Sequence, residues 1–189
     1  MKSGVRVIGI DDSPFQRNDK TALVVGVVCR KGRGTASDQS LIVEGVLSTR
    51  VHVDGDDGTE KLCGMILNSR FKAELNAILL NGIMLAGFNV VEINELSSET
   101  GIPVLALTRK KPDPVAVENA LKKVPGWEVK LSKINSAGSS KRIEGWHAQL
   151  SGTDLNGARD IIRIFGNSPV RLAHLIASGV IRGESRGRA

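Results

Sequence analysis

Two aspartates end the first apolar segment of the chain and are of a type that binds divalent cations. The segment 5–10 is apolar and rich in β-branched residues, and Asp11-Asp12-Ser13-Pro14 follows it. Successive strand residues face opposite sides of a sheet, so only one of the two carboxylates can point into a given cleft. Mg²⁺ binds one or two carboxylates together with phosphate oxygens, and open α/β sheets bind ligands where strands end. The alternative is that one aspartate caps the turn and the other is solvated.

A second acidic group, Asp54-Gly55-Asp56-Asp57-Gly58, follows a later apolar segment. It resembles part of a calcium loop, but no glutamate at the required distance completes an EF-hand. A turn can present side chains toward a neighbouring strand end, which makes Asp54 and Asp57 candidate partners of Asp11. The alternative is a solvated turn. Asn81-Gly82 ends another apolar segment, where the asparagine offers a neutral oxygen and the glycine permits close approach of a ligand.

A basic segment, Arg109-Lys110-Lys111, follows a further apolar stretch. We interpret it either as a set of phosphate contacts or as a solvated basic turn. The histidines His52, His147 and His174 have no metal-ligand spacing, and the apolar neighbours of His174 predict a hydrogen-bonded packing residue. The chain has no GxSxG motif, and neither cysteine lies near a histidine in a recognisable pattern, so acyl transfer by a nucleophile has no support.

The elements that must position these residues follow from the hydrophobic pattern. Strands are predicted over 5–10, 21–29, 41–53, 77–80 and 102–107, and a late pair of short strands over 127–134 and 145–150, with a loop over 135–140. Helices are predicted over 60–71, capped by Thr59, and over 91–99, 114–124, 154–164 and 169–178. A hairpin loop is predicted over 31–34. Three antiparallel strands followed by parallel βαβ units predict a mixed α/β sheet with flanking helices.

Composition indicates a single globular domain over 1–189, with a mobile basic tail over 182–189. Of the 189 residues, 41% are hydrophobic, which excludes a disordered chain. The two cysteines, Cys29 and Cys63, lie in separate apolar stretches and indicate free thiols in a reducing cytoplasm. No apolar run reaches the length of a signal peptide or a membrane span, so we expect a cytoplasmic protein with no membrane partner.

Charge is unevenly distributed along the chain. Residues 1–108 hold 11 basic and 13 acidic residues, a balance of −2, and residues 109–189 hold 15 and 7, a balance of +8, which together give the net +6. An acidic half joined to a basic half suits a metal-dependent enzyme that acts on phosphodiesters. Solvated basic faces are the alternative. Aromatic residues make up only 3% of the chain, fewer than a stacking platform for single-stranded nucleic acid needs.

Five short motifs, in order, resemble those of endonuclease V in the ribonuclease H-like superfamily, and more closely those of an archaeal uncharacterised family, domain of unknown function ninety-nine. Gly9-Ile10-Asp11 is similar to GxD of the first strand, Gly45-Val46-Leu47 through Arg50 to GFLxxR, Asn81-Gly82 to DG, Ile102-Pro103 to Arg109 to iPxxxxK, and Ser168-Pro169-Val170-Arg171-Leu172-Ala173 to PxPxRxA. The resemblance covers nearly the whole chain and implies the ribonuclease H-like fold.

Endonuclease V enzymes cut a phosphodiester bond near inosine in DNA or RNA, using Mg²⁺ held by three carboxylates. The resemblance implies that Asp11 is the first of these ligands and that Mg²⁺ or Mn²⁺ is the cofactor. Val51 stands in place of the second carboxylate, a glutamate, and Asn81 in place of the third. The tyrosine-containing wedge has no counterpart, and Thr153 or Asp154 lies nearest to the position of the late catalytic histidine. One carboxylate with a neutral amide compensates poorly for the desolvation of a divalent ion.

The sequence leaves three hypotheses open. The first is a divalent-metal-dependent endonuclease with a degenerate carboxylate site, which requires an aspartate of the 54–57 turn or Asp12 to approach Asp11. Its catalytic residues are Asp11, Asp54, Asp57 and Asn81, its metal ligands Asp11, Asp12 and Asp54, and its contacts to DNA or RNA Arg109, Lys110 and Lys111. The second is a noncatalytic module that binds nucleic acid and has lost the metal site. The third is a partner-binding or small-molecule protein in which the charge asymmetry is incidental.

Overall fold

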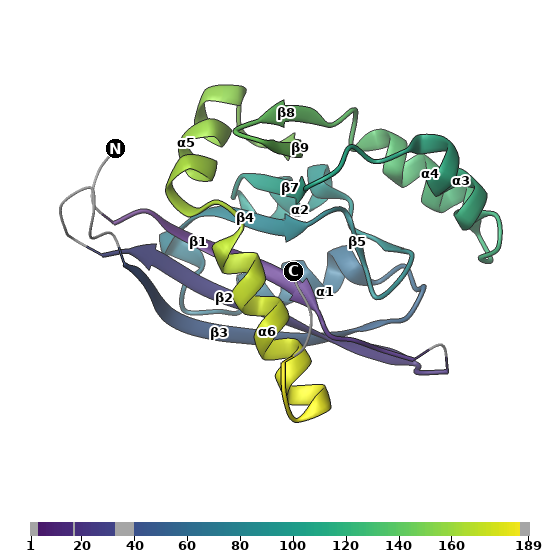
Figure 1. The fold of residues 1–189 in the computed structure, drawn as a ribbon, viewed down its shortest axis with the longest axis horizontal. Helices are drawn as coiled ribbons and strands as arrows, with labels where there is room; N and C mark the ends of the chain where they lie inside the picture. Colours follow the sequence, from purple (N-terminus) through teal and green to yellow (C-terminus); the bar gives the residue numbers. More distant parts are fainter. Residues whose placement is uncertain (1–3, 17, 33–39, 186–189) are drawn as a thin grey trace.

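A seven-stranded mixed sheet forms the central layer of the protein (Figure 1). The computed structural model describes residues 4–16, 18–32 and 40–185. The strands lie in the order β3-β2-β1-β4-β7-β9-β8. Their bounds are β1 Arg6–Asp12, β2 Thr21–Lys31, β3 Leu41–His52, β4 Leu75–Asn81, β7 Val104–Thr108, β8 Lys141–Ile143 and β9 Trp146–Ser151. A separate hairpin pairs β5 (Met84–Leu85) with β6 (Asn89–Val90).

The strand directions confirm the predicted mixed sheet. β1, β2 and β3 form an antiparallel meander. β4 pairs in parallel with β1, and β7 in parallel with β4. β9 is antiparallel to β7 and carries β8 at the edge. The carboxyl ends of β1, β4 and β7 therefore meet at one edge of the sheet, which we call the mouth.

Helices cover both faces of the sheet (Figure 1). The helices are α1 Gly58–Leu67, α2 Ile93–Thr100, α3 Pro114–Leu121, α4 Trp127–Ser136, α5 Leu155–Phe165 and α6 Ser168–Arg182, with a 3₁₀ turn at Lys72–Glu74. Apolar residues of α1 and α2 share one core with the strands, and apolar residues of α5 and α6 share the other. In the chain as described, no helix is long and apolar enough to cross a membrane.

Alternation along β1 divides its side chains between these two cores. Ile8 and Ile10 lie in the core with α1 and α2, whereas Val7 lies in the core with α5 and α6. Because strand residues repeat with a period of two, Gly9 and Asp11 share the face of Val7. The sequence pattern of β1 thus directs Asp11 toward α6.

The prediction of a strand over 127–134 is wrong, because this segment is helix α4. Trp127, Leu131 and Ile134 recur at intervals of four and three, which is helical spacing. α4 ends at Ser136, so it also takes the start of the predicted 135–140 loop. The true partner of β9 is β8, and the two pair in an antiparallel hairpin.

The predicted capping role of Thr59 is also wrong. The N-cap position of α1 is Asp57, which makes no side-chain capping bond, and the Thr59 hydroxyl instead accepts from the backbone N–H of Glu92 at 2.9 Å. That bond ties α1 to the start of α2. α6 extends to Arg182, and the rest of the predicted 182–189 tail lies outside the described residues from 186 onward, as does the predicted hairpin loop from 33 onward.

Candidate functional site

Asp11 lies at the mouth of the sheet, beside Asn81. Each residue comes one position after the pair Ile10–Leu80, the last that joins β1 to β4. The Asn81 side-chain nitrogen lies 3.4 Å from each carboxylate oxygen of Asp11. The parallel pairing of two strands that are distant in sequence therefore brings together two of the predicted site residues.

The two neighbouring aspartates face opposite sides, as the alternation of a strand requires. Asp11 points toward α6, where His174 contacts it. The Asp12 carboxylate instead accepts from the backbone N–H of Ala86, in the β5–β6 hairpin, at 2.9 Å. Asp12 thus anchors the hairpin from the other face of the sheet.

His174 completes the contacts of Asp11. Its Nδ1 lies 3.1 Å from Asp11 Oδ2, and the side chain of Asp11 is 3% exposed while that of His174 is 22% exposed. Within α6, Val170, Ala173 and Ala177 are buried, and His174 lies four residues after the first of these. The helical period that predicts a buried stripe on α6 could have placed His174 against the sheet, but nothing local in the sequence indicates that its partner is Asp11.

Gly9 allows α6 to approach the sheet closely enough for this contact. A Cβ atom at Gly9 would lie 2.2 Å from the carbonyl carbon of Pro169 and 2.3 Å from the backbone nitrogen of Val170. No side chain fits there, so the first turn of α6 rests directly on the backbone of β1. Gly9 precedes Asp11 by two residues on the same face, and the helix that packs on Gly9 carries His174 to Asp11.

Burial makes the carboxyl group of Asp11 a weaker acid than an ordinary aspartate. Desolvation raises the pKa of Asp11 to about 7, and the charge of Asp12 adds to this effect, while bonds from the Asp12 backbone and from Asn81 act in the opposite direction. Burial also raises the pKa of Asp12. A carboxyl group with a pKa near neutrality can take up or release a proton under physiological conditions, which is the requirement for acid–base chemistry.

The carboxylates of the acidic turn 54–57 form hydrogen bonds and an ion pair with neighbouring elements. The Asp54 carboxylate accepts from the backbone N–H of Phe88 at 2.8 Å, and its own N–H donates to Ala86 at 2.9 Å. Asp56 pairs with Lys130 of α4 at 2.9 Å, and this lysine is 1% exposed. The turn therefore fastens the β5–β6 hairpin and α4 to the end of β3.

Asp57 is the most fully bonded carboxylate of this turn. It accepts from the backbone N–H of His52 at 3.0 Å, from the His52 ring at 2.8 Å and from the Asn89 side chain at 2.7 Å. Burial alone would raise the pKa of Asp57, but the bonds from Asn89 and His52 outweigh it and lower the pKa. Asp57 thus has the contacts of a structural anchor.

The basic segment Arg109-Lys110-Lys111 follows β7 at the mouth, on the same edge as Asp11 and Asn81, and all three of its residues are exposed. The Thr108 hydroxyl donates to the backbone oxygen of Lys110 at 2.9 Å, which shapes the turn. The Arg109 guanidinium lies 5.8 Å from the centre of the Trp146 ring.

The side chains at the mouth fit a divalent cation only together with a substrate. Asp11 supplies one carboxylate, and rotation of the Asn81 amide by half a turn would present its oxygen. Among the described residues, no group of three or more His, Cys, Asp or Glu side chains is arranged to hold a metal ion. Mg²⁺ accepts one or two protein carboxylates when phosphate oxygens and water fill its other positions. Within the described parts of the chain, the side chains at the mouth are therefore too few to hold an ion without a substrate.

Comparison with solved structures places the fold in the class to which endonuclease V belongs. A protein of unknown function from Archaeoglobus fulgidus superposes with a TM-score of 0.82 at 35% identity, covering 95% of this chain and 99% of that one. Human endonuclease V superposes with a TM-score of 0.55 at 15% identity, covering 95% and 85%. Ciona intestinalis endonuclease V, in complex with DNA containing an inosine, gives 0.51 at 13%, covering 89% and 82%. The predicted ribonuclease H-like fold is confirmed.

The chain belongs to the family described as endonuclease dU, whose model matches residues 3–181. It is 41% identical to a UPF0215 protein of Methanothermobacter thermautotrophicus, over 100% of this chain and 94% of the relative. It is 44% identical to a UPF0215 protein of Thermococcus sibiricus, over 98% of this chain and 97% of the relative. These archaeal relatives agree with the predicted resemblance to an uncharacterised archaeal family.

Proposed function

We propose that the protein is an endonuclease that cuts a phosphodiester bond of DNA near deoxyuridine. The family is described as endonuclease dU, in which we read dU as deoxyuridine, and a structural neighbour of the same fold was solved in complex with DNA that contains an inosine. The observation that carries the proposal is the buried carboxylate of Asp11 at the mouth of the sheet, in contact with His174 and Asn81. This is the place where open α/β sheets bind their ligands.

Asp11 and His174 form a pair that can move a proton. An ionised Asp11 can only accept hydrogen bonds, so His174 Nδ1 then carries the hydrogen of the 3.1 Å contact. This fixes the tautomer and leaves Nε2 able to take a proton from an attacking water. The carboxylate also stabilises the imidazolium ion that forms. We assign His174 the role of proton acceptor and Asp11 that of its partner.

Mg²⁺ or Mn²⁺ held by Asp11 and the Asn81 oxygen would polarise a phosphoryl oxygen of the bound substrate. We assign Asp12 and Asp54 to the support of the β5–β6 hairpin, because each bonds to its backbone. Asp57 supports the same region through Asn89.

Arg109, Lys110 and Lys111 provide positive charge where the substrate backbone would pass. They lie at the mouth beyond β7, the neighbour of the strand that carries Asn81. Phosphate contacts by Lys and Arg position a nucleic acid without reading its sequence and weaken as salt concentration rises. This accounts for a DNA or RNA partner without assigning base recognition to these residues.

Cleavage of labelled oligonucleotides tests the proposal. Three otherwise identical strands carry deoxyuridine, inosine or only ordinary bases, and each is incubated with Mg²⁺, Mn²⁺ or chelator. We expect cleavage of the deoxyuridine strand and its loss in Asp11→Asn. Asp160→Asn is the matched control, because Asp160 is exposed and lines a hollow at the opposite end of the sheet. Equal cleavage by both variants, or none by the native protein, contradicts the proposal.

A noncatalytic nucleic-acid-binding protein is the second candidate, favoured by the neutral Asn81 beside the single carboxylate of Asp11. It predicts binding of oligonucleotides that falls with salt and is unaffected by chelator. Anisotropy of a labelled strand measures this binding. Binding without cleavage under every metal condition supports this candidate over the endonuclease.

A further inference from the structure

Trp146 and Arg109 lie together at the mouth of the sheet. Thr108 and His147 form the last pair that joins β7 to β9. Arg109 follows this pair and Trp146 precedes it, so the two residues face each other one step further out. The Arg109 guanidinium stands over the indole ring, 5.8 Å from its centre. This places an aromatic surface and a fixed positive charge at a single point of the mouth.

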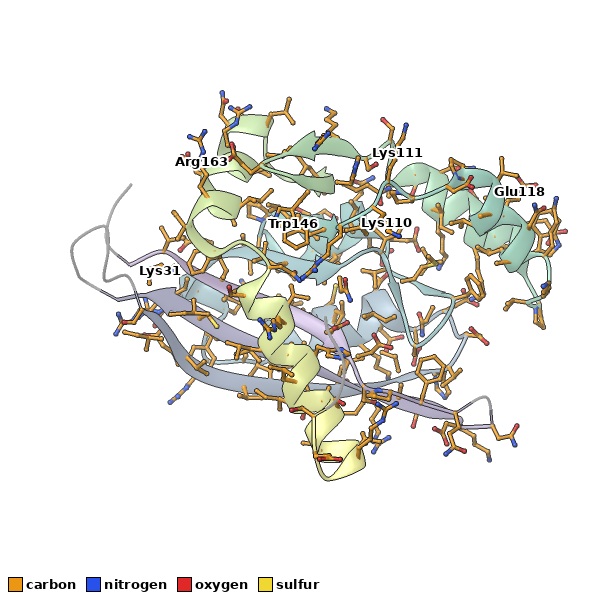
Figure 2. All side chains as sticks on the ribbon, viewed as in Figure 1. Lys31, Lys110, Lys111, Glu118, Trp146 and Arg163 are labelled. Atoms are coloured by element: carbon orange, nitrogen blue, oxygen red, sulfur yellow. The ribbon has the colours of Figure 1, made fainter. Side chains whose placement is uncertain are left out.

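Trp146 shares a face of the sheet with Asp11 and His174. Its side chain packs against the core formed with α5 and α6, the same face toward which Asp11 points. In the view of Figure 2, Trp146 lies between α5 and α6. From β1 to β9 there are three strand spacings, roughly 14 Å at ~4.8 Å each. Trp146 is therefore within reach of nucleotides that flank a phosphate bound at Asp11.

The indole is only partly buried, so part of it remains accessible beside an exposed arginine. Partly exposed aromatic rings at positively charged grooves stack nucleic-acid bases, and arginine adds a cation–π contribution. Aromatic residues make up only 3% of the chain, which excludes a row of stacking side chains. One accessible ring is sufficient to hold one base.

Resting on the proposed function, we propose that Trp146 stacks on one unpaired base that flanks the cut phosphodiester bond, while Arg109 binds the adjoining phosphate. The contact recognises the aromatic surface of the base, which all four bases share, and not its hydrogen-bonding edge. It holds the strand in register with Asp11 and requires the bound strand to be single or locally opened.

Tryptophan fluorescence tests this contact directly, since the chain has two tryptophans. Trp127→Phe leaves Trp146 as the only one, and Trp146→Phe leaves Trp127. Trp127 is a matched control, because it also lies under a cation, Lys122, at 5.7 Å from the ring centre. Both variants carry Asp11→Asn so that the strand stays intact. They are titrated with a single-stranded deoxyuridine oligonucleotide, with anisotropy of the labelled strand measured in parallel.

We expect the Trp127→Phe protein to lose at least half of its fluorescence at saturation, and the Trp146→Phe protein to change little. Bound oligonucleotide without quenching of Trp146, or quenching of Trp127 alone, overturns the inference. So does the absence of any binding.

Two substitutions of Trp146 test the inference through the affinity for the oligonucleotide. Stacking on an aromatic side chain contributes enough that its loss weakens binding roughly five- to 150-fold. Trp146→Leu is expected to weaken binding to this extent, while Trp146→Phe, which keeps a ring, stays within about threefold. Equal affinities for the two variants, both shown to be folded by circular dichroism, assign Trp146 a packing role only and overturn the inference.

Cleavage by the protein with Trp127→Phe alone separates this inference from the proposed function. Cleavage of the oligonucleotide without quenching of Trp146 fluorescence rejects the stacking contact and supports the proposed endonuclease activity. Quenching without cleavage rejects the endonuclease and leaves a stacking contact in a binding protein.

Discussion

Asp11 and Asp57 show how the same side chain serves two purposes in one molecule. Asp57 accepts three short hydrogen bonds, and these lower its pKa. The Asp11 carboxylate is more deeply buried, and it is contacted by the Asp12 backbone N–H at 3.1 Å, by the Asn81 amide at 3.4 Å and by the His174 ring at 3.1 Å, yet its pKa is raised to about 7. Protein donors satisfy the first carboxylate. The second has a raised pKa despite its donors, because burial destabilises its charged form more than these bonds stabilise it, and carboxyl groups with such perturbed pKa values mark candidate functional sites.

The largest effect is expected from His174→Ala, which removes the proposed proton acceptor and the partner of Asp11. General acid–base groups contribute ~10²–10⁴-fold to rates, so we expect kcat for oligonucleotide cleavage to fall by at least ~10²-fold. Gel-based single-turnover assays measure this loss. A fall of less than about threefold would assign His174 a packing role, as its apolar neighbours predicted.

Gly9→Ala tests whether the close approach of α6 to β1 positions His174. The new Cβ atom would lie 2.2 Å from the Pro169 carbonyl carbon, so the helix or the strand must move. Overpacking of this kind costs about 1–3 kcal/mol of unfolding free energy, measurable by urea denaturation. We also expect a lower cleavage rate at constant folded fraction. Ala at Gly64, where a Cβ atom meets nothing within 4 Å, is the matched control.

Asp57→Asn is expected to destabilise the protein by about 1–3 kcal/mol at neutral pH, because the buried Asn89 side chain and the exposed His52 then share one neutral acceptor oxygen in place of a charged carboxylate. The pKa of Asp57 is lowered on folding, so its stabilisation is present above the unfolded pKa and is lost as pH falls through the folded pKa. The difference between variant and native protein should therefore shrink below pH ~4. Urea denaturation at pH 7 and pH 3 measures it. A difference independent of pH would contradict the assignment.

An effect of opposite sign is expected for Asp11→Asn in chelator. The folded pKa of Asp11, about 7, lies above its unfolded value, so ionisation of this group destabilises the native state as pH rises from ~4 to 7. The neutral amide avoids this cost. We expect the variant to melt higher than native protein at pH 8, by roughly 2–4 °C for each kcal/mol recovered, and to match it near pH 4. A lower melting temperature at pH 8 would show that ionised Asp11 is well compensated.

Much of the fold could be predicted, because its signals are local. Alternation and turn residues located the meander and the strand that ends at Asp11, and five motifs in order indicated the ribonuclease H-like fold. The strand predicted over 127–134 failed because a short apolar pattern fits both periods, and the buried Lys130 of α4 finds its partners in the distant 54–57 turn.

The site was harder to predict, since its contacts join residues far apart in the chain. His174 lies 163 positions from Asp11, and no local pattern connects them. The sequence shows Gly9 only as part of a motif. Only the packing of Pro169 against β1 explains why this position cannot carry a side chain. Asp54 bonds to Phe88 and Asp57 bonds to Asn89, both in the β5–β6 region, which the sequence did not assign to this turn.

Cleavage by Asp11→Asn and Asp57→Asn, assayed side by side at equal folded fraction, tests the central claim most directly. Both variants make the same chemical change, one at the carboxylate whose pKa is raised and one at the carboxylate whose pKa is lowered. We predict that Asp11→Asn slows cleavage of the deoxyuridine oligonucleotide by at least ~10²-fold, while Asp57→Asn stays within about threefold of the native rate. Native-like cleavage by Asp11→Asn, or an equal loss in both variants, would contradict the account.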